Sequence, residues 1–325
     1  MYLRAFVNYV VEIRFLARGV RRGTQVAPGA ATMAGFARTV ERVVLVVVFI
    51  CAVAGNPNAE PGPDWLARLN LYRATALLPP VVEDPGLSGA VLEHARYMVA
   101  HGVVRHSQNR RDRWATPGGA AAAAASNLAG SIRPTEPDSW AVDLWMQAPF
   151  HALGILDPGL DHVGFGIHHA PNGRVQTAAG LDVINGRRTA PRSIAYPVLW
   201  PANGSSVPLA THTVEDPSPL TSCPGYRAPT GLPLIVQLGA GDLVPQVTAS
   251  WIVEEGRLLE HCVFGEGTYR NRNAGQQRLA RSILAARDAV VLIPREPLRP
   301  GSSYRAVVEV DGRLIDWTFA ISGGM

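Results

Sequence analysis

A change of hydrophobic pattern near residue 195 constrains the fold of this 325-residue chain more than any other feature. Before it, apolar residues recur with helical spacing in several segments. From Tyr196 onward the chain is rich in proline and glycine, and short β-prone runs at this spacing favour a β-sandwich. These runs cover 232–238, 247–253, 289–294 and 304–310, and an alternating run closes the chain. We therefore expect an α+β protein whose second domain, 196–325, is a small all-β sandwich.

Three helices are predicted before that boundary. In the first, Trp65, Leu69 and Tyr72 form one apolar stripe at i, i+4 and i+7. The second begins with an aspartate that can cap it and a proline at the first helical position. The three helices are expected at 64–76, 84–102 and 138–147.

A pair of strands is expected after the third helix. The runs HVGFGIHH and VQTAAGLDV flank the turn Pro171-Asn172-Gly173, which is a good hairpin signal. The alanine tract 120–125 fits the first part of a short helix. Residues 64–190 are therefore predicted to form a domain of helices and a sheet.

An unbroken apolar run, Val43 to Ala54, marks the N-terminal part of the chain. It is shorter than the roughly 20 residues that a membrane span needs, and it suits the core of a signal peptide. Two arginines precede it, and Ala52-Val53-Ala54 fits a cleavage site. We expect a leader at 1–54, a linker at 55–63 and no transmembrane span after cleavage.

The start of the leader has a second interpretation. Met33 begins a better-proportioned signal peptide than Met1, so Met33 is predicted to be the true start. An uncleaved membrane anchor is the rival prediction. A lipoprotein is less favoured, because Ile50 precedes Cys51 where a small residue is usual.

The net charge of +4 comes from the leader. Residues 1–54 carry seven arginines and two glutamates, a net of +5, which leaves −1 for residues 55–325. A nearly neutral mature chain lacks the electrostatic support that nucleic-acid binding needs, so we expect no nucleic-acid partner. Hydrophobic residues make up 47% of the chain and charged residues 17%, which favours packed cores over general disorder.

The cysteines point to one disulfide bond. Cys51 falls in the leader, so the mature chain keeps Cys223 and Cys262. An even pair in an exported protein predicts a bridge between them, and two thiols that never meet are the alternative.

Six motifs follow one another between residues 65 and 183: LNLYR, LEHARYM, a histidine in a loop, NLAG, LWMQAPFH and DHVGFGI. Their order resembles the bacterial branch of the CAP superfamily (cysteine-rich secretory, antigen 5 and pathogenesis-related 1 proteins). In that family a core of the form N-x-x-R, H, E-N-[IL]-A, W-M-x-S-P-x-H-R and V-G-x-G recurs. The resemblance implies an α-β-α sandwich for residues 64–190, and the end of the chain is similar to the last strands of bacterial Ig-like modules.

The resemblance assigns site residues one by one. His106 and His151 match the two cavity histidines, and Asn127 matches the asparagine between them. Ser126 falls where the family has a glutamate, and Gln147 stands near a second position that holds glutamate in eukaryotic members. The cavity is thus expected to keep two histidines without their carboxylates. The remaining matches are Asn70, Arg73, Trp145-Met146 and 163–166.

Two neutral imidazoles in one cleft are the first candidates for chemistry. They can bind a divalent metal such as zinc, but zinc sites usually have three or four protein ligands. His106 and His151 would need water or a neighbour such as His101 or Asp143, so weak binding is expected. Histidines between helices also often do no more than bridge backbone groups, and this interpretation is favoured.

The same histidines are weak candidates for acid and base catalysis, because an imidazole titrates near neutral pH. Ser107 and Ser126 are candidate nucleophiles by position alone. The chain has neither a G-x-S-x-G nor an H-E-x-x-H motif.

The favoured function is a non-enzymatic binding module in the cell envelope or outside the cell. The resemblance implies export and capture of a small apolar ligand, such as a lipid or sterol, or of an envelope or host component. The predicted binding residues are His106, Ser126, Asn127 and His151. The alternatives are a histidine-dependent or metal-assisted hydrolase acting on envelope or protein substrates, and a structural envelope protein.

Overall fold

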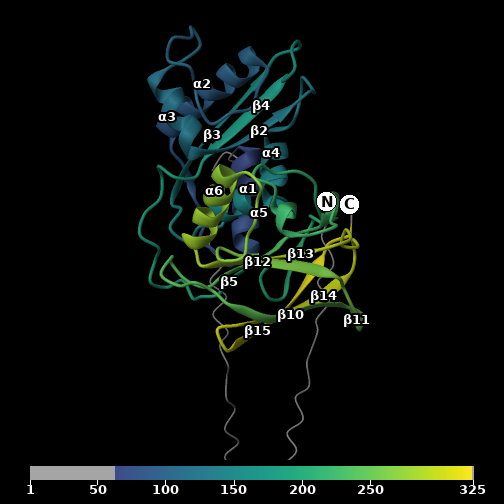
Figure 1. Cartoon of the computed structure of the whole chain (residues 1–325). Coiled ribbons are helices and arrows are strands. Elements are labelled where there is room, and N and C mark those ends of the chain that lie inside the picture. Colours follow the sequence, from purple (N-terminus) through teal and green to yellow (C-terminus); the bar gives the residue numbers. More distant parts are fainter. Residues whose placement is uncertain (1–62, 324–325) are drawn as a thin grey trace, which may run out of the picture. The chain divides into compact units, whose positions relative to one another are not determined.

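The computed structural model describes residues 63–323 (Figure 1). The predictions for the signal peptide, its cleavage site and the start at Met33 fall outside these residues. Within residues 63–323, no helix combines the length and the hydropathy needed to cross a bilayer.

The helices of the first region, residues 64–190, follow the sequence pattern. α1 is Asp64–Thr75, α2 is Pro85–His101 and α4 is Asp138–Met146, so the three predicted helices are confirmed. α3, Pro117–Ala125, contains the alanine tract. A further helix, α5, Pro149–Ile155, begins where the sequence predicts only a break, because a proline is well tolerated at the first position of a helix.

The ends of α2 are set by local chemistry. The Asp84 side chain accepts hydrogen bonds from the backbone N–H groups of Gly86 and Leu87, at 2.8 and 3.1 Å. At the other end Gly102 adopts a left-handed conformation with φ 61°, which favours glycine. Both predicted boundaries of this helix are therefore confirmed.

Four strands form a mixed sheet in the first region, in the order β1-β3-β4-β2. β1 pairs with β3 in parallel, and the other pairs are antiparallel. The hairpin predicted around Asn172 joins β3 to β4 and is confirmed. The strands are β1 Val82–Glu83, β2 Ser126–Ser131, β3 His162–His169 and β4 Thr177–Asp182.

Successive residues of β3 face opposite sides of this sheet, and helices cover both of its faces (Figure 1). Gly166 faces α2, and any side chain there would overlap the backbone of Leu92. Phe165 lies against the other layer. Its ring stacks on Trp65 of α1 with centroids 4.8 Å apart and meets Trp145 of α4 edge-on at 6.4 Å. The glycines of the VGFG motif thus give α2 its close approach to the sheet.

Arg73 on α1 is buried and joins distant segments of the first region. Its guanidinium donates hydrogen bonds of 2.6 to 3.3 Å to backbone carbonyls. Burial lowers the pKa of Arg73 to about 10, and the charge of Asp157 opposes this shift. The accepting carbonyls belong to Pro79, Ile155, Asp157 and Leu160.

The C-terminal region consists mostly of strands in several sheets. One sheet has the order β11-β10-β14-β15-β6, a second has the order β12-β13-β9-β5, and β7 pairs with β8. The predicted strand runs all lie in or around these strands. The strands are β5 Val198–Trp200, β6 Ser205–Val207, β7 Thr211–His212, β8 Thr230–Gly231, β9 Leu234–Gln237, β10 Val247–Glu254, β11 Arg257–Leu258, β12 His261–Gly265, β13 Ala289–Pro294, β14 Ser303–Val310 and β15 Arg313–Ile321.

The C-terminal region also holds a helix that the expectation of an all-β domain omits. α6, Ala274–Ala285, begins at Asn273, whose side chain accepts from the N–H groups of Gly275 and Gln276. Its buried residues, Ala280 and Leu284, lie one turn apart. Two aligned apolar positions in a segment rich in arginine and glutamine are a weak signal for a helix. The strand-like runs on either side therefore lead to the prediction of an all-β domain.

One hydrophobic core runs through both regions. Tyr72 of α1 meets Trp200 of β5 edge-on, with ring centroids 5.5 Å apart. The buried Gln237 side chain of β9 donates to the carbonyl of Leu156 at 2.9 Å. Phe150 of α5 packs on aromatic rings of the C-terminal region. The residues on either side of the expected boundary are thus packed together, and α6 and α5 are in contact.

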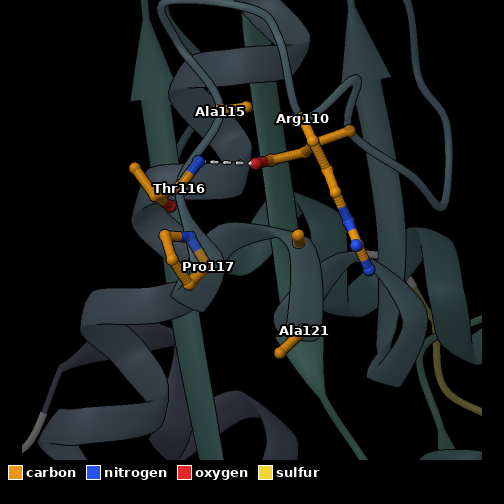
Figure 2. Close-up of a pocket in the computed structure, with 7 residues that line it drawn as sticks. Arg110, Ala115, Thr116, Pro117 and Ala121 are labelled. Carbon is orange, nitrogen blue, oxygen red and sulfur yellow. Dashed lines mark hydrogen bonds between the residues drawn. The ribbon is translucent and has the colours of Figure 1, made fainter.

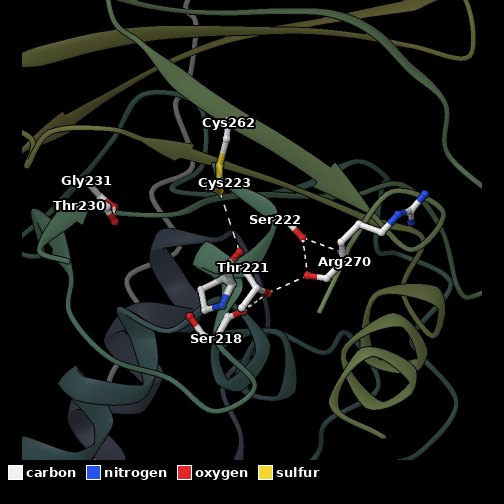
Figure 3. The surroundings of a disulfide bond; sticks show 9 residues. Ser218, Thr221, Ser222, Cys223, Thr230, Gly231, Cys262 and Arg270 are labelled. Atoms are coloured by element: carbon white, nitrogen blue, oxygen red, sulfur yellow. Dashed lines mark hydrogen bonds between the residues drawn. A yellow bond between two sulfur atoms is a disulfide. The ribbon is translucent and has the colours of Figure 1, made fainter. Parts of the chain in front are cut away.

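The predicted disulfide is present between Cys223 and Cys262, with Cα atoms 5.6 Å apart (Figure 3). It joins the short 3-10 helix η1, Pro219–Ser222, to β12. Close by, the hydroxyl of Thr221 donates to the carbonyl of Arg270 at 2.7 Å, and the N–H of Arg270 donates back to the Ser222 hydroxyl at 2.7 Å. The bridge joins residues 39 apart in the chain, and the hydrogen bonds join residues 48 and 49 apart.

Candidate functional site

A cavity of about 410 Å³ lies between the first region and the C-terminal region. This volume falls in the range of small-molecule sites. Its walls come from α3 and the loop before it, from β2, α5 and α6, and from segments that follow β4, β7 and α6. The lining is mostly apolar, and its residues are His106, Ala124, Ala125, Ser126, Asn127, Phe150, His151, Gly154, Val183, Ile184, Asp216, Pro217, Leu279, Ile283 and Arg287.

His151 on α5 is held by a glutamate from the C-terminal region. Oε1 of Glu215 lies 2.7 Å from Nδ1 of His151 and also accepts the backbone N–H of His151 at 2.8 Å. The Glu215 side chain is completely buried, and its second oxygen, Oε2, has no partner among residues 63–323. The cavity therefore has a carboxylate at its second histidine.

His106 lies in the loop between α2 and α3 and is exposed at the rim of the cavity. Its Nδ1 is 3.0 Å from the backbone carbonyl of Ala123. Because a carbonyl can only accept, the proton of the neutral ring sits on Nδ1. Desolvation of the ring lowers the pKa of His106, the hydrogen bond to Ala123 opposes this shift, and the nearby His151 lowers the pKa further.

Ser126 and Asn127, at the start of β2, supply the other predicted polar groups. The Asn127 side chain donates to the carbonyl of His151 at 3.0 Å, so it ties β2 to α5. The hydroxyl of Ser126 is buried and has no hydrogen-bond partner within the described part of the chain. A buried hydroxyl without a partner is costly, which makes it available to a ligand.

α6 and the segment before η1 form the wall on the C-terminal side. Gln276 of α6 donates to Asp216 at 2.6 Å and links the two elements. Leu279 lines the cavity and is 51% exposed, and Ile184 on the opposite region is 47% exposed. Two large apolar side chains are thus left partly open to solvent at this cavity.

The four residues predicted to bind, His106, Ser126, Asn127 and His151, all line this one cavity. The additional metal ligands considered from sequence lie elsewhere. His101 pairs with Asp112 at 2.9 Å, and Asp143 pairs with Arg68 and Tyr72. Ser107 does not line the cavity.

Sequence reasoning misses the cavity residues of the C-terminal region, such as Asp216, Leu279 and Arg287, and it misses Glu215, which holds His151. Glu215 is 64 residues away from His151 and lies past the family-like segment, so no local spacing connects the two. The sequence around Glu215, THTVEDPS, carries no motif that marks this glutamate as a site residue. The expectation that both histidines lack a carboxylate is therefore wrong for His151.

A second, larger cavity of about 580 Å³ lies beside α3. The Arg110 side chain runs along one side of it, and Thr116 and Pro117 lie on the other (Figure 2). The Thr116 N–H donates to the side chain of Gln108 at 2.9 Å. None of the predicted site residues lines this cavity, so it is not the candidate site.

The donor set at the candidate site does not fit a resident zinc ion. Zinc sites use three or four protein ligands. In residues 63–323 no group of three or more histidine, cysteine, aspartate or glutamate side chains is arranged to hold a metal. His106 and His151 alone leave the coordination incomplete.

Comparison with known proteins agrees with the first region of the fold. Residues 66–183 match the family model described as CAP: Cysteine-rich secretory protein family. No curated protein matches the chain. The matched segment ends before Glu215, Asp216 and α6, so the C-terminal side of the cavity lies outside the family match. The chain therefore carries a CAP domain over residues 66–183, followed by a largely β C-terminal region.

Proposed function

We propose that this protein is an exported binding protein that takes a small, mostly apolar ligand into the cavity between its CAP domain and its C-terminal region. The observation that carries the proposal is the composition of the cavity wall. Apolar side chains such as Phe150, Val183 and Ile283 surround a few convergent polar groups. This is the usual make-up of a small-molecule site.

The exposure of Leu279 and Ile184 supports a binding role. Each leaves about half of its surface in water, although both lie at the wall of one cavity. Covering that surface with an apolar ligand is favourable by about 25 cal/mol per Å². A purely structural contact between the two regions would leave less of this surface uncovered.

Export is supported by the disulfide and by the predicted leader. A bridge such as Cys223–Cys262 forms and persists in oxidising compartments. The signal-peptide pattern that ends near Ala54 predicts delivery to such a compartment.

The proposal is tested with N-phenyl-1-naphthylamine, a neutral apolar dye that fluoresces when it leaves water. We expect saturable dye binding to the purified protein and a strong loss of binding in Leu279→Arg. Leu314→Arg is the matched control, because Leu314 is 65% exposed on β15 and does not line the cavity. Equal binding by both variants, or no saturable binding by the unmodified protein, would overturn the proposal and favour a structural role.

A hydrolase is the second candidate, and one observation favours it. Glu215 orients His151 as a carboxylate orients a catalytic base, and Ser126 lies in the same cavity. Against it, Ser126 makes no hydrogen bond to either histidine. Hydrolysis of p-nitrophenyl esters that is lost in both His151→Ala and Ser126→Ala would establish the enzyme. Activity that survives either change would exclude this pair as its source.

A further inference from the structure

The loop between α2 and α3 carries an excess of positive charge. Residues 104–114, VRHSQNRRDRW, hold four arginines and one aspartate, a net of +3. Since residues 55–325 together have a net charge of −1, the remainder of that stretch has a net of −4. One loop of a slightly acidic chain is therefore strongly basic. Its arginines are Arg105, Arg110, Arg111 and Arg113.

No acidic partner neutralises these arginines within residues 63–323. All four are exposed, and their guanidinium groups make no ion pair with any of those residues. The acid of the loop, Asp112, is bound instead to His101 on α2, with 2.9 Å between Oδ2 and Nε2. Exposed Arg174 adds a fifth arginine, since its Cβ lies 3.2 Å from the position a Cβ would take on Gly102. We call these five arginines the basic patch.

The loop that carries the basic patch is held in place by α2. Nε2 of the buried His94 donates to the Arg105 carbonyl at 2.8 Å, and its Nδ1 accepts from the Gln108 side chain at 3.1 Å. The N–H of Asn109 donates to the Tyr97 hydroxyl at 3.0 Å. A loop that is already ordered loses little conformational entropy when it meets a partner.

Apolar side chains stand at both ends of the basic loop. Val104 is 41% exposed and Trp114 is 43% exposed. The guanidinium carbon of Arg113 lies 5.5 Å from the centroid of the Trp114 ring, as in a cation–π contact. Tryptophan is favoured at the boundary between lipid headgroups and hydrocarbon, and anionic headgroups attract arginine. A soluble polyanion would use only the charges, so the exposed apolar groups favour a bilayer surface as the partner.

We propose that the basic patch docks the protein on a bilayer that contains anionic phospholipids, with Trp114 inserted at the level of the headgroups. The inference is independent of the proposed function, because it concerns the outer surface of the loop and not a ligand inside the cavity. His106 belongs to the same loop and stands at the rim of the candidate cavity. Docking would therefore bring that rim close to the membrane.

The role of charge is tested by co-sedimentation of the full chain with vesicles of phosphatidylcholine and phosphatidylglycerol, against vesicles of phosphatidylcholine alone. We expect much stronger binding to the anionic vesicles. Each arginine near an anionic surface contributes about fivefold in affinity, so Arg110→Gln/Arg111→Gln should weaken binding on the order of twentyfold. Arg227→Gln/Arg313→Gln is the matched control, because it removes the same charge from two exposed arginines of the C-terminal region. Binding through the leader is common to both variants, so their difference reports the loop.

The role of Trp114 is tested by fluorescence on the same vesicles. Insertion of the indole should shift the emission to shorter wavelength when the vesicles are added. Trp114→Ala should lose most of this shift and bind more weakly. Trp251→Ala should keep both the shift and the affinity. It is the matched control, because Trp251 is 40% exposed on β10, away from the loop.

Salt provides a measurement that needs no variant. Raising the salt concentration from about 0.1 M to about 1 M shortens the Debye length from about 10 Å to about 3 Å, so the unmodified protein should leave the anionic vesicles. Equal affinity of the two double arginine variants, or binding that salt does not weaken, would overturn the proposal. A Trp114→Ala variant that keeps both the affinity and the emission shift would overturn it as well, and would favour a soluble polyanion as the partner.

Discussion

Asp157 and Arg287 lie 130 residues apart in the chain, and their side chains form a buried ion pair with 2.6 Å between Oδ2 and Nη2. Asp157 follows α5 in the CAP domain, whereas Arg287 follows α6. Burial lowers the pKa of Arg287, and the charge of Asp157 opposes that shift. The pair joins the two regions directly beside the candidate cavity.

Breaking this pair should destabilise the whole protein. In Asp157→Asn the buried guanidinium of Arg287 loses its countercharge, and Arg187, which shares the same carboxylate oxygen, loses its partner as well. Removing one partner of a buried pair typically costs about 3–5 kcal/mol. Urea unfolding measures the change. Asp316→Asn is the control, because its partner Arg305 is exposed and the loss should be much smaller. Equal losses in the two variants would contradict a special role for the buried pair.

The approach of α2 to the sheet should depend on Gly166. In Gly166→Ala the added methyl group would overlap the backbone of Leu92, so α2 must move away from β3. Overpacking of this kind typically costs about 1–3 kcal/mol. Thermal unfolding checks the expectation against Gly267→Ala, since a methyl group at Gly267 meets no atom within 4 Å. If the two variants unfold alike, the close packing is not strained.

The contributions of His94 and His101 to stability should depend on pH in opposite directions. Desolvation lowers the pKa of the buried His94, so the unfolded chain takes up a proton first as pH falls below about 6.5, and stability decreases. Hydrogen bonds to the Tyr97 carbonyl and to Asp112 raise the pKa of His101, so its contribution is present at low pH and is lost as pH rises through the folded-state value.

Urea unfolding at about pH 5 and about pH 7.5 separates the two effects. His94→Gln should lose less stability on acidification than the unmodified protein, and His101→Ala should lose more. Changes of the pH dependence in the same direction for both variants would show that one of these assignments is wrong.

The disulfide should contribute strongly to stability. Cys223 and Cys262 are separated by 39 residues, and closing a loop of that length stabilises the folded state by about 4 kcal/mol in the chain-entropy description. Cys223→Ala/Cys262→Ala should therefore unfold at a lower urea concentration. Adding a reducing agent should lower the stability of the unmodified protein and leave the double variant unchanged. A double variant as stable as the oxidised protein would contradict this expectation.

Zinc should bind weakly at the candidate site. Two imidazoles supply fewer ligands than a stable zinc site requires, and the described residues hold no larger group of metal ligands. Protein purified without a chelator should contain much less than one zinc per chain. Near-stoichiometric zinc that is lost in His106→Ala would show that a third ligand joins the two histidines.

The sequence alone determined the helices and strands wherever the local signal was strong. The cap at Asp84 and the glycine at 102 bound α2, and the turn at Asn172 predicts the β3–β4 hairpin. The order of short motifs was enough to predict the CAP domain, because each motif serves local packing. Gly166, for example, lets α2 approach β3 closely, because a side chain there would overlap the backbone of Leu92.

Only the tertiary structure decided how the candidate site is completed. His106, Ser126, Asn127 and His151 were expected together, but Glu215 and α6 reach them from segments that follow the matched family region. No periodicity or spacing links Glu215 to His151, because a contact across 64 residues depends on how two regions share one core. Hydrophobic burial is non-directional, so the sequence shows which residues will be buried without showing which partners they meet.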